Sequence, residues 1–177
     1  MPARSRMRKT NSRPGSRSSK DAIALLKQDH QNVRQLLKKL ESAEEGDERL
    51  ELFSQVENEL KVHTKIEEEI FYPAFHQASE GEKDEHLYYE AVEEHHVVDM
   101  VLPEIRDTDE NSDEFAAKAK VLKDLVEHHA EEEETEMFPK ARKLMESSEL
   151  KELGQQLEQR KMELMGSTGG GRRRRAA

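Results

Sequence analysis

The feature that most constrains the fold of this chain is an internal repeat. The segment HTKIEEEIFYP at residues 63–73 returns 66 residues later as HAEEEETEMFP at residues 129–139, with the histidine, the glutamate four residues on and the proline in equivalent places. Upstream of each copy, DHQNVRQLLKKL at residues 29–40 aligns with EHHVVDMVLPEI at residues 94–105, at an offset of 65. The sequence therefore indicates one pair of elements used twice.

Each of the four segments carries an apolar stripe whose members recur at steps of three and four residues, the period of an α-helix. The four stripes are Ile23, Leu26, His30, Val33, Leu37 and Leu40; Val56, Leu60, His63, Glu67 and Ile70; Tyr88, Ala91, His95, Val98, Leu102 and Ile105; and Leu122, Val126, His129, Glu133 and Met137. We expect helices over residues 20–41, 48–75, 82–106 and 113–146. Four long helices with short polar links predict an all-α, up-down-up-down four-helix bundle.

Local signals define the ends of these helices. Ser19 is the expected N-cap of the first helix, and Asn111 or Ser112 that of the fourth. Pro73 and Pro139 should kink or end their helices early, because proline removes an amide donor. A short fifth helix over residues 149–165 is expected to pack across one end of the bundle.

Composition supports a helical protein and excludes several classes of site. Charged residues make up 38% of the 177 residues and aromatic residues only 5%, which favours long helices with one buried stripe. The chain has no Cys, so it has no disulfide, no thiolate metal site and no cysteine nucleophile. No apolar run approaches the ~18–20 residues that span a bilayer, and no secretory signal is evident. We expect a cytoplasmic protein without a membrane partner.

Charge is distributed unevenly along the chain. Residues 1–20 carry seven Lys and Arg and residues 166–177 carry four Arg, with no acidic residue in either segment, so the formal charge of residues 21–165 is near −21. We expect residues 1–19 and 166–177 to be disordered basic tails around one domain at residues 20–165. Such tails can bind nucleic acid, but solvated tails are the favoured interpretation.

The stripes turn four imidazoles and two carboxylates toward the core at matched depth. These residues are His30, His63, Glu67, His95, His129 and Glu133. The spacing His-x-x-x-Glu is a weak signal alone, since His76, His86 and His128 also have Glu four residues on. Register with the apolar stripe selects the six. It favours His129 over His128, whereas the choice between His95 and His96 stays open.

A buried, unpaired carboxylate costs several kcal/mol, which is a large share of the ~5–15 kcal/mol net stability of a small domain. Divalent metal bound by neutral imidazole and carboxylate removes that cost. Six ligands are too many for one tetrahedral zinc ion. Two metal ions, each with two histidines and sharing two glutamates, use all six. The ligand set suits Fe, Mn and Zn alike.

At these residues the chain resembles the hemerythrin-like HHE cation-binding family. The resemblance covers roughly residues 20–165 and rests on DH at 29–30, EHH at 94–96 and the two repeated segments. It implies a four-helix bundle with a non-haem, oxo- or hydroxo-bridged di-iron centre, with the four histidines as terminal ligands and Glu67 and Glu133 as bridges. Asp99 stands where the oxygen-carrying members have a fifth histidine, which disfavours reversible oxygen carriage.

The resemblance implies a protein that binds or converts a small oxidant, namely dioxygen, peroxide or nitric oxide, in a redox or oxidative-stress response. Two alternatives stay open: an iron-dependent sensor or scavenger without turnover, and a metal-free helical adaptor. The sequence does not decide whether the protein is an enzyme. Tyr72, Tyr88 and Tyr89 are either packing residues or a ligand or redox partner of the site, and Tyr88 is the best placed by its stripe.

Overall fold

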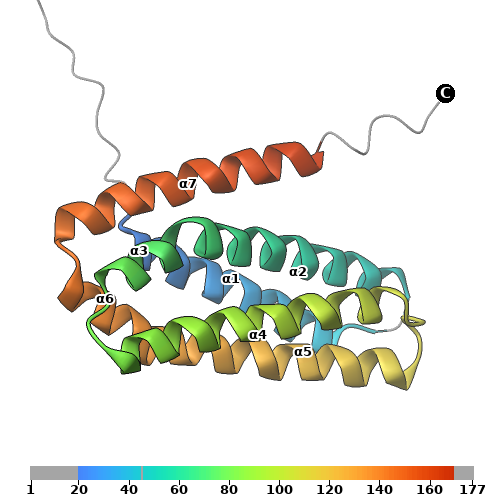
Figure 1. Cartoon of the computed structure of the whole chain (residues 1–177). Helices are drawn as coiled ribbons and strands as arrows, with labels where there is room; N and C mark the ends of the chain where they lie inside the picture. The colour runs from blue at the N-terminus through green and yellow to red at the C-terminus, as the bar shows by residue number, and fades with distance from the viewer. Residues whose placement is uncertain (1–19, 45, 170–177) are drawn as a thin grey trace, which may run out of the picture.

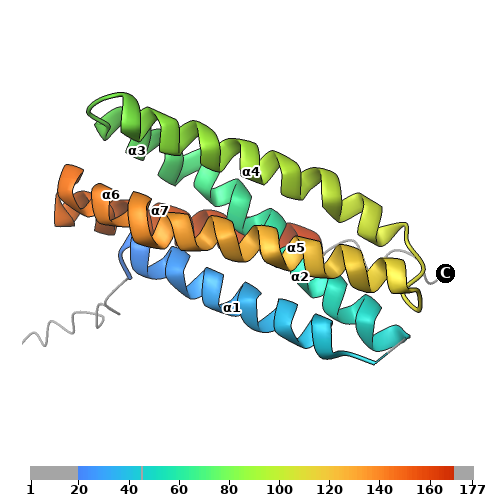
Figure 2. The same ribbon diagram turned by 90° about the horizontal axis from the view of Figure 1, so that it is seen from below.

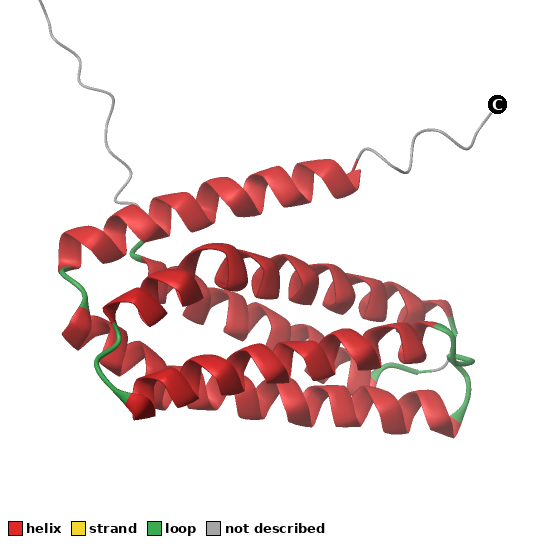
Figure 3. Ribbon diagram, viewed as in Figure 1, coloured by secondary structure: helices red, strands yellow, loops and turns green. Residues whose placement is uncertain are grey.

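The computed structural model describes residues 20–44 and 46–169, and these residues form helices and no strand (Figure 3). They form the predicted four-helix bundle with an additional C-terminal helix (Figures 1 and 2). The predicted disorder of residues 1–19 and of residues 170–177 lies outside the described residues. None of the described helices is both long and apolar enough to cross a membrane.

Two of the four bundle helices contain a short π-helical turn. In chain order the elements are α1 (Ala22–Ser42), α2 (Asp47–Ile66), η1 (Glu67–Phe71), α3 (Tyr72–Ala78), α4 (Glu82–Arg106), α5 (Asp113–Glu132), η2 (Glu133–Met137), α6 (Phe138–Leu144) and α7 (Ser147–Gly169). The second bundle helix is α2, η1 and α3 in continuous succession, and the fourth is α5, η2 and α6. The predicted helix boundaries hold to within three residues.

Of the two predicted N-caps, that of the fourth bundle helix is confirmed and that of the first is not. Ser112 caps α5 as predicted, since its hydroxyl accepts a hydrogen bond from the Phe115 amide. The first helix begins at Ala22, and its N-cap is Asp21, whose carboxylate accepts from the Ala24 amide at 2.8 Å. The prediction of Ser19 as this cap was therefore wrong, because the helix starts two residues later than expected and an aspartate is available there.

The two prolines neither end nor sharply break their helices. The π-helical turns Glu67–Phe71 and Glu133–Met137 lie immediately before Tyr72–Pro73 and Phe138–Pro139. A π-helical turn widens the helix by one residue, and this accommodates a proline that cannot donate to the carbonyl four residues back. Both turns begin at the glutamates that the sequence selected.

The π-helical turns also change which residues face inward. Beyond Glu67 the stripe predicted Ile70, yet Ile70 is half-buried, whereas Phe71, Tyr72 and Phe75 are fully buried. The inserted residue rotates the following turns by one position. Upstream of the turns the predicted stripes are buried, apart from Tyr88, which is half-buried.

The apolar core is divided into two clusters, with the inward histidines and glutamates between them. One cluster contains Phe71, Phe75 and Phe138 near the α3 and α6 end of the bundle. The other contains Val33, Leu60, Val98 and Val126 and extends toward the opposite end. A polar layer at this position is held by rigid apolar packing on both sides.

The C-terminal helix α7 is longer than the expected 149–165 and includes residues 166–169, which were predicted to belong to a tail. It lies along α1 and α2 instead of across one end (Figure 1). Its Leu150, Leu153 and Leu157 join the first apolar cluster. At Gly154 an added Cβ would lie 2.4 Å from the Lys20 carbonyl oxygen, so only glycine allows this close approach to the start of α1.

Candidate metal centre

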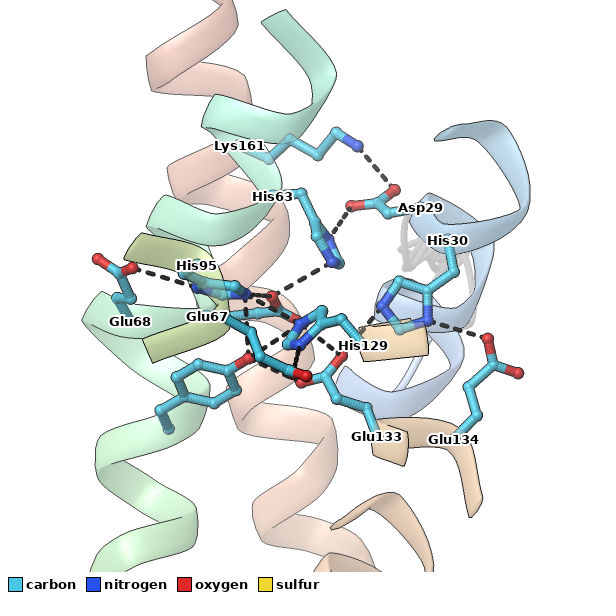
Figure 4. A network of polar contacts seen from close by, with 12 residues as sticks. Asp29, His30, His63, Glu67, Glu68, His95, His129, Glu133, Glu134 and Lys161 are labelled. Carbon is cyan, nitrogen blue, oxygen red and sulfur yellow. Dashed lines mark hydrogen bonds and ion pairs between the residues drawn. The ribbon is translucent and has the colours of Figure 1, made fainter. Parts of the chain in front are cut away.

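The structure brings the six predicted site residues together from all four bundle helices (Figure 4). His30 comes from α1, His63 from the last turn of α2, His95 from α4 and His129 from the last turn of α5. The exposed fraction of each of the six residues is 6% or less. The neighbour of His95, His96, is exposed, and so are His76, His86 and Asp99, so none of these four lies in the buried layer.

The first cluster of donor atoms joins His30, His63, Glu67 and Glu133. His30 Nε2 lies 3.1 Å from Glu133 Oε2, and His63 Nε2 lies 3.2 Å from Glu67 Oε2. The two imidazole rings meet edge to face, with centroids 4.8 Å apart. The four donor atoms lie within 4.8 Å of one another, which is close enough to share one cation.

The second cluster joins His95, His129 and the same Glu67. His95 Nε2 lies 3.4 Å from Glu67 Oε2, and His129 Nε2 lies 3.7 Å from Glu133 Oε2. The two Nε2 atoms face each other at 3.0 Å. Each histidine pair thus approaches both carboxylates, although only Glu67 belongs to both clusters of donor atoms.

The buried polar atoms of this layer lack partners of the ordinary kind. Of its donor atoms, His30 Nε2, His63 Nε2, both carboxylate oxygens of Glu67 and Glu133 Oε2 have no hydrogen bond among the described residues. Buried polar groups are nearly always hydrogen-bonded, since each one left unsatisfied costs about 1–3 kcal/mol. Neutral imidazole nitrogens and carboxylate oxygens are ligands of divalent iron, manganese and zinc. The residues present therefore fit a two-metal site.

The pKa values of the buried carboxyl and imidazole groups are shifted strongly and in opposite directions. Burial raises the pKa of the Glu67 carboxyl well above its usual value, and the Glu133 carboxylate raises it further. Burial acts in the same direction on Glu133, but its interactions with the imidazoles of His129 and His30 outweigh it, so the pKa of Glu133 is lowered. Burial would lower the pKa of His30, yet Glu133 and Glu134 raise it to about 9. Burial lowers the pKa of His63 to about 4.

The pKa of about 9 leaves a positive charge on His30 at neutral pH, and the raised pKa of Glu67 favours its protonated form. A bound cation would displace these protons, because it needs a deprotonated carboxylate and a neutral imidazole as ligands. Metal binding and proton release are therefore coupled at this site.

A second set of carboxylates contacts the outward Nδ1 atoms of the same four histidines. Glu134 lies 3.0 Å from His30 Nδ1, Glu68 3.2 Å from His95 Nδ1, Glu94 2.7 Å from His129 Nδ1 and Asp29 3.9 Å from His63 Nδ1. A carboxylate at Nδ1 fixes the ring orientation and the tautomer and makes Nε2 a stronger ligand. Three of the inward histidines, His30, His95 and His129, have such a partner at hydrogen-bond distance. His63 Nδ1 makes no hydrogen bond to any described residue, and Asp29 is its longer-range ion-pair partner.

Sequence reasoning did not find these outer carboxylates, although a signal was present. Each one is the sequence neighbour of an inward residue: Asp29 and Glu94 precede histidines, and Glu68 and Glu134 follow glutamates. On a helix the neighbour of an inward residue points sideways toward the adjacent helix, so it can reach across to that helix's histidine. Each of the doublets DH, EH and EE therefore contains one inward residue of the site and one outer carboxylate.

The tyrosine that reaches the site is Tyr72, at the start of α3, and Tyr88 does not. Tyr72 is fully buried and its hydroxyl donates to Glu133 Oε1 at 2.9 Å. The same oxygen lies 3.2 Å from His95 Nε2 and 3.4 Å from His129 Nε2. Burial raises the Tyr72 pKa well above its usual value, and the Glu133 and Glu67 carboxylates add to the shift. Tyr88 packs edge to face on Tyr72.

Comparison with known families supports the metal interpretation. The family described as Hemerythrin HHE cation binding domain matches residues 21–141. An uncharacterised protein of Mycobacterium tuberculosis, Rv2633c, is 30% identical over 149 residues, which cover 83% of this chain and 89% of the relative. The family match at residues 21–141 includes all six inward residues and ends before α7.

A solved structure agrees at the level of the fold. The crystal structure of a hemerythrin HHE cation binding domain-containing protein from Mycobacterium kansasii, a homologue of Rv2633c, superposes with a TM-score of 0.76 and 28% identity and covers 89% of this chain and 95% of that chain. A DNA nickase of a Nostoc species is 25% identical over 146 residues, which are 82% of this chain but only 40% of the nickase.

Proposed function

The chain belongs to the hemerythrin HHE cation-binding family, and from that premise we propose that it is a non-haem di-iron protein that binds or converts a small oxidant. The observation that carries the proposal is the pair of donor clusters that share Glu67 and leave buried imidazole and carboxylate atoms without other partners. We propose His30, His63, His95 and His129 as terminal ligands, with Glu67 and Glu133 as bridges. Manganese and zinc are the alternative metals.

The residues around the site favour a very small ligand. A cavity of about 20 Å³ lies against all four histidines. Four apolar side chains from the second core cluster, those of Val33, Leu60, Val98 and Val126, line it as well. A cavity of this size has room for about one water molecule, so it suits dioxygen, nitric oxide or peroxide and excludes larger substrates. The apolar lining also keeps bulk water away from the histidines.

The other residues of the site hold the ligand side chains in position and orient them. Iron, when bound, would supply one-electron redox chemistry and coordination positions for the oxidant. The outer carboxylates hold the imidazoles in position through Nδ1. The Tyr72 hydroxyl holds a proton directed at Glu133 Oε1, and it is within reach of two histidines as a further ligand or as a redox partner. This protein would act in an oxidative-stress or redox response in the cytoplasm.

A metal-free adaptor is disfavoured, because the unpaired buried atoms would then destabilise the core. An iron-dependent sensor or scavenger without turnover uses the same residues, so turnover is what separates it from an enzyme. The similarity to the nickase spans less than half of that protein, and we transfer no nuclease activity to this chain. Nucleic-acid binding by the basic tails stays a prediction, since those segments lie outside the described residues.

The test is the metal content and absorption spectrum of the protein after expression in iron-supplied cells. We expect close to two iron atoms per chain and near-ultraviolet charge-transfer bands. Addition of peroxide then separates turnover from sensing. A chain that takes up a single metal ion, or only zinc with iron in excess, would overturn the di-iron proposal.

Matched substitutions test the ligand set. His63→Ala and His129→Ala should lose metal, because each removes a buried donor. His76→Ala and His86→Ala should keep the wild-type metal content, since both of these histidines are exposed although each has Glu four residues on. Equal metal loss in all four variants would show unfolding instead of ligand loss.

A further inference from the structure

One His-x-x-x-Glu pair outside the buried site lies directly beside it on the same helix. His128 and Glu132 lie on α5, one residue before His129 and Glu133, and both pairs belong to the same turn. The side chain of His128 is 63% exposed and that of Glu132 is 32% exposed. We propose that Glu94, His128 and Glu132 form a third, surface site for divalent cations, through which metal reaches the buried ligands.

The donor atoms of these three residues converge. His128 Nε2 lies 3.5 Å from Glu132 Oε1 and 3.7 Å from Glu94 Oε1. One donor atom from each residue falls within 4.8 Å of the others, the same closeness as in the two buried clusters. Imidazole and carboxylate donors at this spacing suit Fe²⁺, Mn²⁺ or Zn²⁺.

Glu94 connects this surface cluster to the buried site. Its Oε1 faces His128, while its Oε2 lies 2.7 Å from His129 Nδ1. A small pocket between α4 and α5 is lined by Glu90, Glu94 and Glu132 together with the buried His129 and Glu133. No Lys or Arg is among the described residues that line it. The pocket therefore presents carboxylates, ion-paired only with imidazoles among the described residues, from the surface to the buried ligands, and negative charge in a cleft raises the local cation concentration.

The inner end of the pocket carries a buried carboxylate whose Oε2 forms ion pairs only with imidazole nitrogens among the described residues. The side-chain exposure of the lining carboxylates falls from 43% at Glu90 to 24% at Glu94 and 2% at Glu133. Glu133 Oε2 makes no hydrogen bond to any described residue. A cation held at the surface cluster therefore has a buried carboxylate oxygen, free of hydrogen bonds and paired with His30 at 3.1 Å, next along the same pocket.

The other half of the repeat shows that this arrangement is not a consequence of the fold. The positions equivalent to His128, Glu132 and Glu90 are Val62, Ile66 and Leu25. Val62 and Ile66 are buried, and α7 packs along α1 and α2 on this side of the bundle (Figure 1). The carboxylate equivalent to Glu94 is Asp29, and it pairs with Lys161 of α7 at 2.7 Å. Polar donors thus replace apolar residues only on the half that α7 leaves uncovered.

This inference rests on the proposed function, because it needs the buried residues to be the final metal site. The first experiment compares wild-type protein, a His128→Ala/Glu132→Gln double variant and a His86→Ala control. The control removes another exposed histidine that pairs with Glu four residues on, at 3.3 Å from Glu90. Metal-free protein is mixed with Fe²⁺ under anaerobic conditions, and the iron that remains accessible to a chromogenic chelator is followed with time and at equilibrium.

We expect the double variant to reach the same two irons per chain at about a tenth of the wild-type rate, since charged clefts raise association rates by about 10–10³. The difference should shrink at high ionic strength, and His86→Ala should load at the wild-type rate. Equal loading rates with two irons bound would overturn the surface site and leave the proposed function intact. A double variant that holds fewer than two irons would place His128 or Glu132 in the buried site instead, and wild-type protein that takes up no iron would overturn both proposals.

A second measurement detects the surface site directly. Mn²⁺ is added to protein whose buried site already holds iron, and the electron paramagnetic resonance signal of free Mn²⁺ is recorded. Wild-type protein and His86→Ala should each remove one equivalent of Mn²⁺ that the double variant leaves in solution. If wild-type protein removes no more Mn²⁺ than the double variant, the three residues do not form a cation site.

Discussion

The Tyr72 hydroxyl, on the second bundle helix, donates a 2.9 Å hydrogen bond to Glu133, on the fourth. This bond joins the two copies of the repeated helix pair inside the polar layer. Both residues are fully or almost fully buried, at 0% and 2% exposure. Since hydrogen bonds to charged groups contribute about 1.5–3 kcal/mol, this contact is one of the strongest single links between the two halves.

Tyr72→Phe should therefore lower the free energy of unfolding of the metal-free protein by about 1–3 kcal/mol, because Glu133 Oε1 would lose its donor while staying buried. Urea unfolding measures the change. The control is Tyr88→Phe, whose half-buried ring packs on Tyr72 and His76. In iron-loaded protein, Tyr72→Phe should also change the charge-transfer absorption, as the Tyr72 oxygen lies among the donor atoms of the second cluster. Identical spectra for both variants would argue against a role of Tyr72 at the metal.

Why the sequence pointed to Tyr88 instead of Tyr72 has a physical explanation. Tyr88 falls on a regular 3.6-residue stripe two turns before His95, whereas Tyr72 does not continue the stripe of His63 and Glu67. The π-helical turn that begins at Glu67 inserts one residue and rotates Tyr72 inward. Periodicity alone cannot reveal such an insertion. The positions of all six inward residues were predicted, because His30 and His95 lie on regular α-helices and the other four precede or begin the π-helical turns.

The outer carboxylates were missed for a different reason. Glu94 and Glu134 each have side chains that are 24% exposed, so they lie beside the apolar stripe and not within it. Their role depends on which neighbouring helix they face, and this is a property of the packed bundle. The length and position of α7 also depend on packing, because its apolar residues and Gly154 are complementary to a surface that only the assembled bundle provides.

The pH dependence of metal binding follows from the opposed shifts of pKa. His30 has a pKa of about 9 in the metal-free fold, compared with 6.5 for a free imidazole. A raised pKa stabilises the metal-free fold fully below pH 6.5, and this stabilisation is lost as the pH rises through 9. Metal requires neutral His30 and ionised Glu67, so protons oppose its binding. The metal-induced rise in melting temperature should therefore shrink as the pH falls below about 9 and grow as the pH rises toward that value.

Loading at ~100 times the dissociation constant would add ~2.7 kcal/mol, which corresponds to a shift of several degrees. Thermal melting of metal-free and iron-loaded protein from pH 5 to 8 measures it. Loading at pH 7 in weak buffer should also release a proton from His30, whose pKa of about 9 leaves it charged at that pH. A melting shift that stays constant down to pH 5, or loading without proton release, would mean that these residues are not the ligands.

The link between α7 and the site passes through one buried ion pair. Lys161 Nζ lies 2.7 Å from Asp29 Oδ1, and their side chains are 17% and 6% exposed. Lys161→Met should destabilise the protein by about 2–4 kcal/mol, since it leaves a buried carboxylate with only the more distant His63 as a partner. Arg160 lies on the same helix as Lys161 and forms a more exposed ion pair with Glu69 of η1. Arg160→Met should therefore destabilise the protein less than Lys161→Met does. Urea unfolding distinguishes the two, and equal losses would show that the Asp29 pair has no special importance.

Gly154 gives the sharpest test of how α7 docks, because helix propensity and packing predict opposite signs. Replacing a helical Gly by Ala normally stabilises by up to ~1 kcal/mol. At Gly154 the added Cβ would lie 2.4 Å from the Lys20 carbonyl oxygen and 2.8 Å from the Ala22 amide nitrogen, both of them backbone atoms that cannot move aside cheaply. Gly154→Ala should therefore destabilise the protein by ~1–3 kcal/mol, as overpacked positions do.

Gly166→Ala is the matched control on the same helix, since a Cβ there would meet nothing within 4 Å. It should leave stability unchanged or raise it by up to ~1 kcal/mol. Thermal and urea unfolding of the two variants, with and without iron, measures both effects. If α7 also holds Asp29 in place through Lys161, Gly154→Ala should reduce the iron-induced melting shift as well, whereas Gly166→Ala should not. Stabilisation by Gly154→Ala would mean that α7 does not dock on α1 as closely as the structure has it.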